Sequence, residues 1–331
     1  MNDKITKQKA AVCTAALMLT GTVCPVRAAE SAPLRLMCLG DSITDGFWMP
    51  GGYRNTLCSL ITENGLEQQV DFVGRNWGGS GYDPQHAGYS GYSIDNIAQE
   101  DSISGQRTGL SSFAEQLLAD CPADLIFLQI GTNDILSQYD LAHFGARLRN
   151  LTEIVLDALP ENGALCLATL PVMDANDPLY INPYFFTPES MDQAVNDCNA
   201  QIRSLAKELA DAGKPVYLAE INRVLTKDDL YDGVHPNAEG YEKMGRFWYQ
   251  KMLDFRAGTL KSDADDIPAQ KGDLNADGST DPADCLLLSQ FLTAQDNLTA
   301  EQAASADLDR NRKLTAADLT LLKRGILSPQ L

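Results

Sequence analysis

The chain has 331 residues, of which 44% are hydrophobic, so it is long enough to bury one large core and to carry a smaller second module. Its formal net charge is -19 at pH 7, which disfavours binding to nucleic acid or to an anionic membrane surface. Neutral polymers and metal cations remain compatible with this composition.

Residues 1–28 are typical of a secretory signal peptide. Lysines precede an apolar run over 10–20, and Val26-Arg27-Ala28 forms a small-residue cleavage site. A lipoprotein signal at Cys24 is disfavoured, because Val23 stands where a small residue is needed. No later apolar run approaches the roughly 18 to 20 residues of a membrane helix. We therefore expect a secreted, extracellular protein with no membrane partner.

From Pro33 to Arg256, short apolar runs alternate with longer helical patterns. The predicted strands are Leu34–Leu39, Val70–Val73, Asp124–Ile130, Ala164–Leu170 and Pro215–Ala219, and the predicted helices are Gly52–Glu63, Ser111–Asp120, Leu141–Leu159, Glu189–Ala212 and Ala238–Phe255. Near-continuous hydrophobicity suits strands that are buried on both faces of a parallel sheet. This alternation predicts a three-layer α/β/α sandwich. Asn76–Ser93 and Asp174–Pro188 are predicted as long loops, whose role is either functional or structural.

A polar, acidic stretch after Arg256 has too few apolar residues to be buried, so it separates two domains. The sequence predicts a main domain over 29–256, a linker over 257–271 and a second domain over 272–331. Six cysteines follow the signal peptide, namely Cys38, Cys58, Cys121, Cys166, Cys198 and Cys285. Their spacing matches neither a disulfide scaffold nor a zinc site, although secretion permits one or two disulfides.

A serine nucleophile is predicted at the end of the first strand. Ser42 lies in a turn at the carboxyl end of that strand, where ligands of open parallel sheets bind. A serine needs a base, and His235 is a better candidate than His86 or His143. Asp232, three residues ahead of His235, can accept the Nδ1 proton and leave Nε2 free for the serine. These three residues are the expected catalytic triad.

Attack on an ester also requires donors aimed at the developing oxyanion. The candidates are the backbone N–H groups of Ser42 and Gly91 and the side-chain amide of Asn133. Gly91 and Asn133 each follow an expected strand, so they can reach the same sheet edge as Ser42. Walker A, dinucleotide and Gly-x-Ser-x-Gly motifs are absent from the sequence, and no cofactor is expected for catalysis.

These residues resemble the separated blocks of the GDSL or SGNH hydrolase family. Ser42, Gly91, Asn133 and His235 match four blocks in order, and Asp232 opens the final Asp-x-x-His. The resemblance covers Leu34 to Phe255 and implies an SGNH hydrolase fold, which is flavodoxin-like. The alternative is that these are merely turn residues of an α/β protein.

Within that family the chain is similar to carbohydrate esterase family three, which is associated with removing acetyl groups from xylan. The similarity rests on the segments Gly40–Gly46, Gly52–Arg54 and His86–Asp95. It implies substrate contacts from Trp48, Tyr53, Arg54, His86 and Tyr92. Five aromatic residues near the site are candidates for stacking on sugars, with packing inside the loops as the alternative: Trp48, Trp77, Tyr82, Tyr89 and Tyr92.

The second domain contains a repeat with the ligand spacing of EF-hand-type calcium loops. The first loop offers Asp273, Asn275, Asp277, Ser279, Asp281 and Asp284, and the second offers Asp307, Asp309, Asn311, Lys313, Thr315 and Asp318. Arg312 replaces the turn glycine found at Gly278, so we expect weaker calcium binding in the second loop. Solvated acidic loops without metal are the alternative.

Aspartate at loop position 12, with no helix evident before Asp273, resembles a type I dockerin, a small all-α calcium-binding module. The resemblance implies two Ca²⁺ sites and a cohesin of a scaffoldin as the partner. Pro282-Ala283 and Ala316-Ala317 replace the commoner hydroxyl pair, which leaves the choice of cohesin open.

The sequence thus predicts a secreted, cellulosome-attached acetyl xylan esterase whose substrate is acetylated plant cell-wall polysaccharide. One alternative is an SGNH esterase that acts on acetylated pectin or mannan, or a lipase or thioesterase. An alternative of another class is a non-catalytic polysaccharide-binding module on a dockerin.

Overall fold

The computed structural model describes residues 32–176, 186–263, 272–274, 280–295, 297–298, 300–309 and 313–327. The signal peptide expected over 1–28 lies outside these ranges. So do parts of the loop expected over 174–188 and of the linker expected over 257–271. The region up to Asp263 and the segment from Gly272 onward are each described by themselves.

One sheet of seven strands forms the centre of the larger region. The strands are β1 (Leu34–Gly40), β2 (Val70–Phe72), β3 (Asn76–Trp77), β4 (Gln85–Gly88), β5 (Leu125–Gln129), β6 (Ala164–Ala168) and β7 (Val216–Ala219). Their order is β3-β4-β1-β5-β6-β7, and β2 pairs with the first residues of β1. The described pairings are parallel except that of β3 with β4, so the sheet is mostly rather than wholly parallel. The predicted strands are confirmed, whereas β3 and β4 lie in a stretch predicted as a loop.

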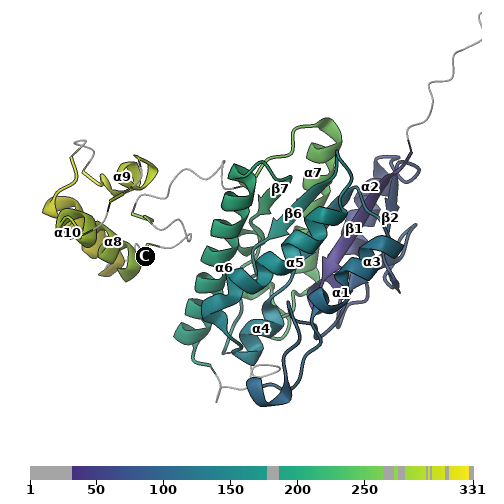
Figure 1. The fold of residues 1–331 in the computed structure, drawn as a ribbon, viewed down its shortest axis with the longest axis horizontal. Coiled ribbons are helices and arrows are strands. Elements are labelled where there is room, and N and C mark those ends of the chain that lie inside the picture. The colour runs from purple at the N-terminus through teal and green to yellow at the C-terminus, as the bar shows by residue number, and fades with distance from the viewer. Residues whose placement is uncertain are drawn as a thin grey trace, which may run out of the picture. The chain divides into compact units, whose positions relative to one another are not determined.

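Helices cover both faces of this sheet, which confirms the three-layer α/β/α sandwich (Figure 1). One face carries α3 (Ala114–Asp120), α5 (Phe144–Ala158) and α6 (Pro188–Asp211), and the other carries α2 (Tyr53–Glu63) and α7 (Ala238–Ala257). Along β1, Met37 and Leu39 enter the first core while Leu36 and Cys38 enter the second. Two-sided burial therefore explains why the strands are apolar at nearly every position.

The six described cysteines all carry free thiols. Burial raises the pKa of Cys38 to about 11 and that of Cys166 to about 12, so both thiols stay protonated and pack as small hydrophobes. None of the helices in the described ranges combines the length and apolar character that crossing a bilayer requires.

The packed region continues to Asp263, past the start of the linker expected at 257. Ser262 Oγ accepts a hydrogen bond from the N–H of Leu218 at 3.0 Å, and Asp263 Oδ2 accepts one from the N–H of Glu220 at 2.8 Å. Asp263 also forms an ion pair with Lys251, whose side chain is 8% exposed. The side chains of residues 262 and 263 therefore cap the free edge of β7.

The segment from Gly272 onward is built from α8 (Pro282–Leu292), α9 (Ala300–Ala306) and α10 (Ala316–Leu327). Leu274, Leu288, Ala306 and Leu322 form its fully buried core. Asp281 is the N-cap of α8, where its side chain accepts from the N–H of Ala283 and Pro282 occupies the first turn. The expected small all-α module is thus present.

We predict that Asp263→Ala will destabilise the larger region by about 3 kcal/mol, because Lys251 would be left buried without its carboxylate. Denaturant unfolding monitored by tryptophan fluorescence measures this free energy. The matched control is Asp211→Ala, which breaks the exposed Lys207–Asp211 pair and should cost no more than about 1 kcal/mol. Equal effects of the two variants would place residues 257–263 in the linker.

Candidate active site

The site forms where three strands end side by side. In the sheet register, Gly40 at the end of β1 pairs with Gly88 of β4 on one side and with Gln129 of β5 on the other. The short helices α1 (Ser42–Asp45) and α4 (Thr132–Ser137) begin just beyond these ends. The segments that carry Ser42, Gly91 and Asn133 therefore start from one edge of the sheet, as parallel strands require.

Two glycines let α1 lie across this edge. A Cβ on Gly88 would lie 2.4 Å from the backbone nitrogen of Asp45, and a Cβ on Gly40 would lie 2.2 Å from the carbonyl oxygen of Gln129. Asp41 caps the helix by accepting a hydrogen bond from the N–H of Ile43 at 3.0 Å. Ser42 is thereby held at the first position of a capped helix that lies directly against the strand ends.

Ser42, His235 and Asp232 are in direct contact. His235 Nε2 lies 2.8 Å from Ser42 Oγ, and His235 Nδ1 lies 2.8 Å from Asp232 Oδ2. The second carboxylate oxygen, Oδ1, accepts the backbone N–H groups of Val234 at 3.1 Å and His235 at 2.7 Å. The structure thus brings the three residues of the expected triad together, and both contacts between them have hydrogen-bond distances.

The triad is almost completely buried, and hydrogen bonds determine the charge state of its carboxyl group. Ser42 is 6% exposed, Asp232 is 4% exposed and His235 is 2% exposed. Burial is the largest influence on Asp232 and would raise its pKa, but the hydrogen bonds from His235 and Val234 together outweigh burial and lower the pKa. Asp232 is therefore an ionised carboxylate that holds the imidazole Nδ1 proton.

Two of the expected oxyanion donors are Asn133, in the first turn of α4, and Gly91, in the loop after β4. Asn133 is 3% exposed, and its Nδ2 donates one hydrogen bond to the carbonyl oxygen of Tyr92 at 2.8 Å. That contact uses one of the two amide protons and links the Asn133 segment to the loop after β4. Gly91 has a φ of 82°, in the region that favours glycine.

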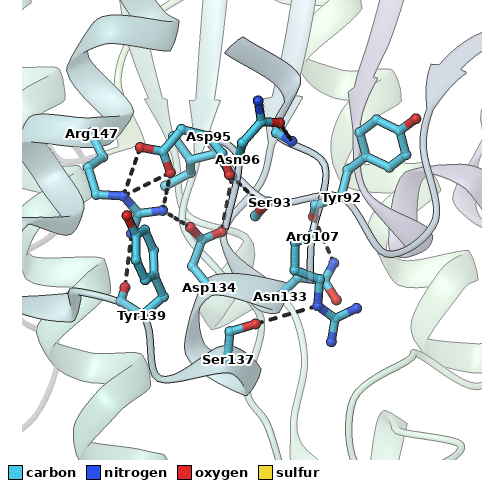
Figure 2. Close-up of polar contacts among 12 residues, drawn as sticks. Tyr92, Ser93, Asp95, Asn96, Arg107, Asn133, Asp134, Ser137, Tyr139 and Arg147 are labelled. Atoms are coloured by element: carbon cyan, nitrogen blue, oxygen red, sulfur yellow. Dashed lines mark hydrogen bonds and ion pairs between the residues drawn. The ribbon is translucent and has the colours of Figure 1, made fainter. Parts of the chain in front are cut away.

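A cluster of polar contacts fastens α4 to the loop after β4 (Figure 2). We call it the Arg147 clamp, formed by Arg147, Asp134 and Asp95. Arg147 pairs with both carboxylates, and Asp134 Oδ2 accepts the N–H of Ile94 at 3.1 Å. Burial is the largest influence on Asp134 and raises its pKa, whereas Arg147 favours the charged form. The clamp thus joins the residue after Asn133 to the segment after Tyr92.

Arg107 adds a second bridge beside the clamp (Figure 2). Its Nη1 donates to the carbonyl oxygen of Gly91 at 3.4 Å, and its Nε donates to Ser137 Oγ at 3.4 Å. Ser137 is the last residue of α4, so Arg107 ties the far end of that helix to the Gly91 turn.

Three of the residues expected to contact substrate are buried. Tyr53, Arg54 and His86 are 1%, 3% and 2% exposed. Arg54 instead donates to the carbonyl oxygens of Thr44 at 3.1 Å and Gly78 at 3.0 Å. Burial, with a further contribution from Arg54, lowers the pKa of His86 to about 3, so this ring is neutral. These residues support the turn after Ser42 from the interior of the protein.

The aromatic residues near the site divide into packed and exposed rings. Tyr89 and Tyr92 pack against Phe113, and Tyr82 packs against Phe72. Trp48 is partly exposed and donates from Nε1 to the carbonyl oxygen of Pro236 at 2.8 Å. Sequence reasoning missed the two exposed rings that border the triad, Phe47 and Tyr231. Their position in the chain, close to Ser42 and next to Asp232, was the available signal.

The two acidic repeats place carboxylates in equivalent positions. Asp284 and Asp318 are fully buried, and each accepts a backbone N–H ten residues earlier, from Leu274 at 2.7 Å and from Leu308 at 3.0 Å. The carboxylates of Asp307, Asp309 and Asp318 offer oxygens within 4.8 Å of one another. Three negative charges so close together fit a divalent cation, which prefers such oxygens.

Some of the other expected calcium ligands lie inside the described ranges, and some lie outside them. Asn275, Asp277, Ser279 and Asn311 lie outside them. Asp273, Asp281, Lys313 and Thr315 lie inside them, where Asp273 is 5% exposed and Asp281 caps α8.

The profile of the GDSL-like Lipase/Acylhydrolase family matches residues 38–243. The chain belongs to this family. The profile of the type I dockerin domain matches residues 271–327, which contain the acidic repeat. The chain is therefore a GDSL-family protein that carries a type I dockerin domain.

Two curated proteins are similar to this GDSL-family chain. A multidomain esterase of Ruminococcus flavefaciens is 31% identical over 92% of this chain, and a putative endoglucanase X of Acetivibrio thermocellus is 30% identical over 51% of it. The chain spans 40% of the first protein's length and 72% of the second's.

Solved structures support the same relationship. A family 3 carbohydrate esterase of Clostridium thermocellum has 28% sequence identity and a TM-score of 0.52, covering 69% of this chain and 99% of that one. A family 3 carbohydrate esterase of Talaromyces cellulolyticus, at 22% identity and a TM-score of 0.50, covers 68% of this chain and 99% of its own and shares the fold.

We predict that Arg147→Met will destabilise the GDSL domain by about 3 to 5 kcal/mol, because Asp134 would be left buried without a counter-charge. Urea unfolding provides the measurement. Arg149→Met is the matched control on the same helix, since Arg149 pairs with Glu208 at the surface, where loss of the pair costs at most about 1 kcal/mol. A small and equal effect of both variants would contradict the role of the clamp.

Proposed function

We propose that this chain is a serine esterase that removes acetyl groups from xylan through an acyl-enzyme intermediate. The observation that carries the proposal is the relay from Ser42 Oγ through His235 to Asp232, with 2.8 Å at each step. Family membership and the likeness to a family 3 carbohydrate esterase support ester hydrolysis at this relay.

In the proposed reaction, Ser42 Oγ attacks the acetyl carbonyl carbon while His235 Nε2 takes the hydroxyl proton. His235 then returns that proton to the sugar oxygen as the ester C–O bond breaks, which leaves the acetyl group on Ser42. Water attacks the acyl-enzyme with His235 again as the base, and acetate leaves. Asp232 fixes the tautomer and stabilises the imidazolium that forms twice in each turnover.

The proposed oxyanion hole consists of the N–H groups of Ser42 and Gly91 and the Nδ2 of Asn133. Its donors come from three strand ends held in one register by Gly40. Donors fixed before the reaction stabilise the developing charge without the cost of reorganisation. The Arg147 clamp supports this assignment, because it holds the Asn133 and Gly91 segments against each other.

Xylan is proposed as the substrate from the resemblance to carbohydrate esterase family three. Acetylated mannan and pectin are the competing polysaccharides, and long-chain esters or thioesters would be the substrates of a lipase or thioesterase. A dockerin favours the polysaccharides, since the module attaches enzymes to a scaffold that acts on plant cell wall.

For the second domain we propose calcium-dependent binding to a cohesin, and hence an extracellular, cellulosome-attached location. Asp307, Asp309 and Asp318 would hold one Ca²⁺ ion, with Thr315 and Asn311 completing the loop. Asp273 and Asp284 would hold a second ion together with Asn275, Asp277 and Asp281. Calcium would neutralise the acidic loops and fix their geometry. We further propose that the esterase domain extends to Asp263, with the linker after it.

Ser42→Ala is predicted to abolish acetate release from acetylated xylan and from a small aryl acetate, with a loss of at least about 10³-fold in kcat. Acetate is measured enzymatically, and circular dichroism checks the fold. Ser80→Ala, at an exposed serine of the same domain, is the control and should keep full turnover. Full turnover by Ser42→Ala would refute the triad. Absence of acetate release from the unsubstituted chain would refute the esterase and favour a non-catalytic binding module.

Removal of calcium with a chelator is predicted to unfold the dockerin domain and abolish cohesin binding, while acetate release continues. Cohesin binding is followed by calorimetry on the full chain, and esterase turnover is measured in the same samples. Restored binding after calcium is added back is the control. Parallel loss of both activities would show that calcium also supports the GDSL domain.

A further inference from the structure

Large aromatic side chains are rarely exposed in the described part of the GDSL domain. Over residues 32–176 and 186–263, the exposed aromatic residues are Phe47, Trp77 and Tyr231. Phe47 follows Ser42 by five positions, and Tyr231 directly precedes Asp232. Two of the three exposed rings therefore lie on the segments that carry the nucleophile and the triad carboxylate.

Phe47 is held against the catalytic base. Its ring stacks on the imidazole of His235 with centroids 4.8 Å apart and an interplanar angle of 28°. Its backbone N–H donates to the carbonyl oxygen of Ser42 at 3.0 Å. One face of the ring thus contacts His235 while 56% of the residue remains exposed to solvent.

Tyr231 is fixed in a similar way through Trp48. The two rings stack at 4.3 Å with an interplanar angle of 17°, and Trp48 is itself anchored by its hydrogen bond to Pro236. The N–H of Tyr231 donates to the carbonyl oxygen of His235 at 2.7 Å. Tyr231 is 47% exposed, so it presents a ring that is already ordered.

Rings that are rigid, flat and half exposed suit a ligand that is itself flat and partly polar. A pyranose ring offers C–H groups on one face for stacking and keeps its hydroxyl groups in water at the edge. An acyl chain instead needs an enclosing wall on several sides to leave water. Because both rings were ordered before binding, stacking on them costs little side-chain entropy.

We propose that Phe47 and Tyr231 form a sugar-stacking platform beside Ser42, which binds pyranose rings of the acetylated polysaccharide. This proposal rests on the esterase function proposed above and adds to it the residues that recognise the polymer. The platform replaces Tyr53, Arg54 and His86 as the substrate contact, and Trp48 acts as its support.

The test compares kcat/KM for acetylated xylan oligosaccharides with kcat/KM for 4-nitrophenyl acetate, which has no sugar. Tyr231→Ala and Phe47→Leu should each lower the ratio of the two by about 5- to 10-fold, mainly through KM for the oligosaccharide. Tyr231→Phe keeps the ring and should restore the ratio. Ile103→Ala is the control and should leave the ratio unchanged, because Ile103 is apolar and 41% exposed but lies on neither triad segment.

A ratio that stays unchanged in both Tyr231→Ala and Phe47→Leu would overturn the platform. A loss that instead grows with acyl length, from acetate to octanoate esters of nitrophenol, would overturn it in favour of an acyl-chain site. These outcomes are separable from failure of the esterase proposal, which would appear as no turnover of the same small ester by the unsubstituted chain.

Discussion

The register of Gly40 between Gly88 and Gln129 is the constraint on which the site depends. It brings the ends of β4, β1 and β5 to one level, so that three separate segments of the chain emerge together. The same backbone proximity forbids a side chain at Gly40 or Gly88. A slip of one residue in either pairing would turn the following segment to the other face of the sheet. The chemistry is thus set by backbone pairing before any catalytic side chain is considered.

A second level of organisation comes from charge in a low-dielectric interior. Asp232 and Asp134 are both buried carboxylates, yet each has a different compensating group. His235 and two backbone N–H groups keep Asp232 ionised, whereas Arg147 balances Asp134 within the framework. Neither carboxylate is tolerable alone, since an unpaired buried charge is costly. The domain therefore couples the geometry of its active site to its stability.

Much of the fold followed from the sequence, because strands buried on both faces are apolar at nearly every position. β3 and β4 were not predictable in this way: they span only Asn76–Trp77 and Gln85–Gly88. They pair Asn76 with His86 and Trp77 with Gln85, without the apolar run that marks the longer strands. The relation of Ser42 to His235 and Asp232 was predictable from residue chemistry and spacing. Their distances required the fold, which joins positions 193 residues apart.

Some of the residues expected to contact substrate are buried in the structure. Tyr53 and Arg54 lie near the serine in sequence, but they begin the buried stripe of α2 that continues through Leu57 and Cys58. That helical spacing was visible in the sequence and argues for burial. The exposure of Phe47 and Tyr231 was not visible in the sequence, because it depends on how two loops meet around His235. A motif therefore identifies the chemical groups of a site more reliably than it identifies its surface.

The capped edge of β7 has a mechanical consequence. The chain leaves the esterase sheet at Asp263, where a carboxylate holds the N–H of Glu220 and pairs with Lys251 on α7. Any tension that reaches this domain along the chain from its dockerin acts first on that anchor. The contacts of Asp263 distribute this tension over the edge strand β7 and the long helix α7. Without them, tension would unwind the final turn of α7 one residue at a time. Under the proposed attachment through the dockerin, this domain is reinforced at the point where the pull enters.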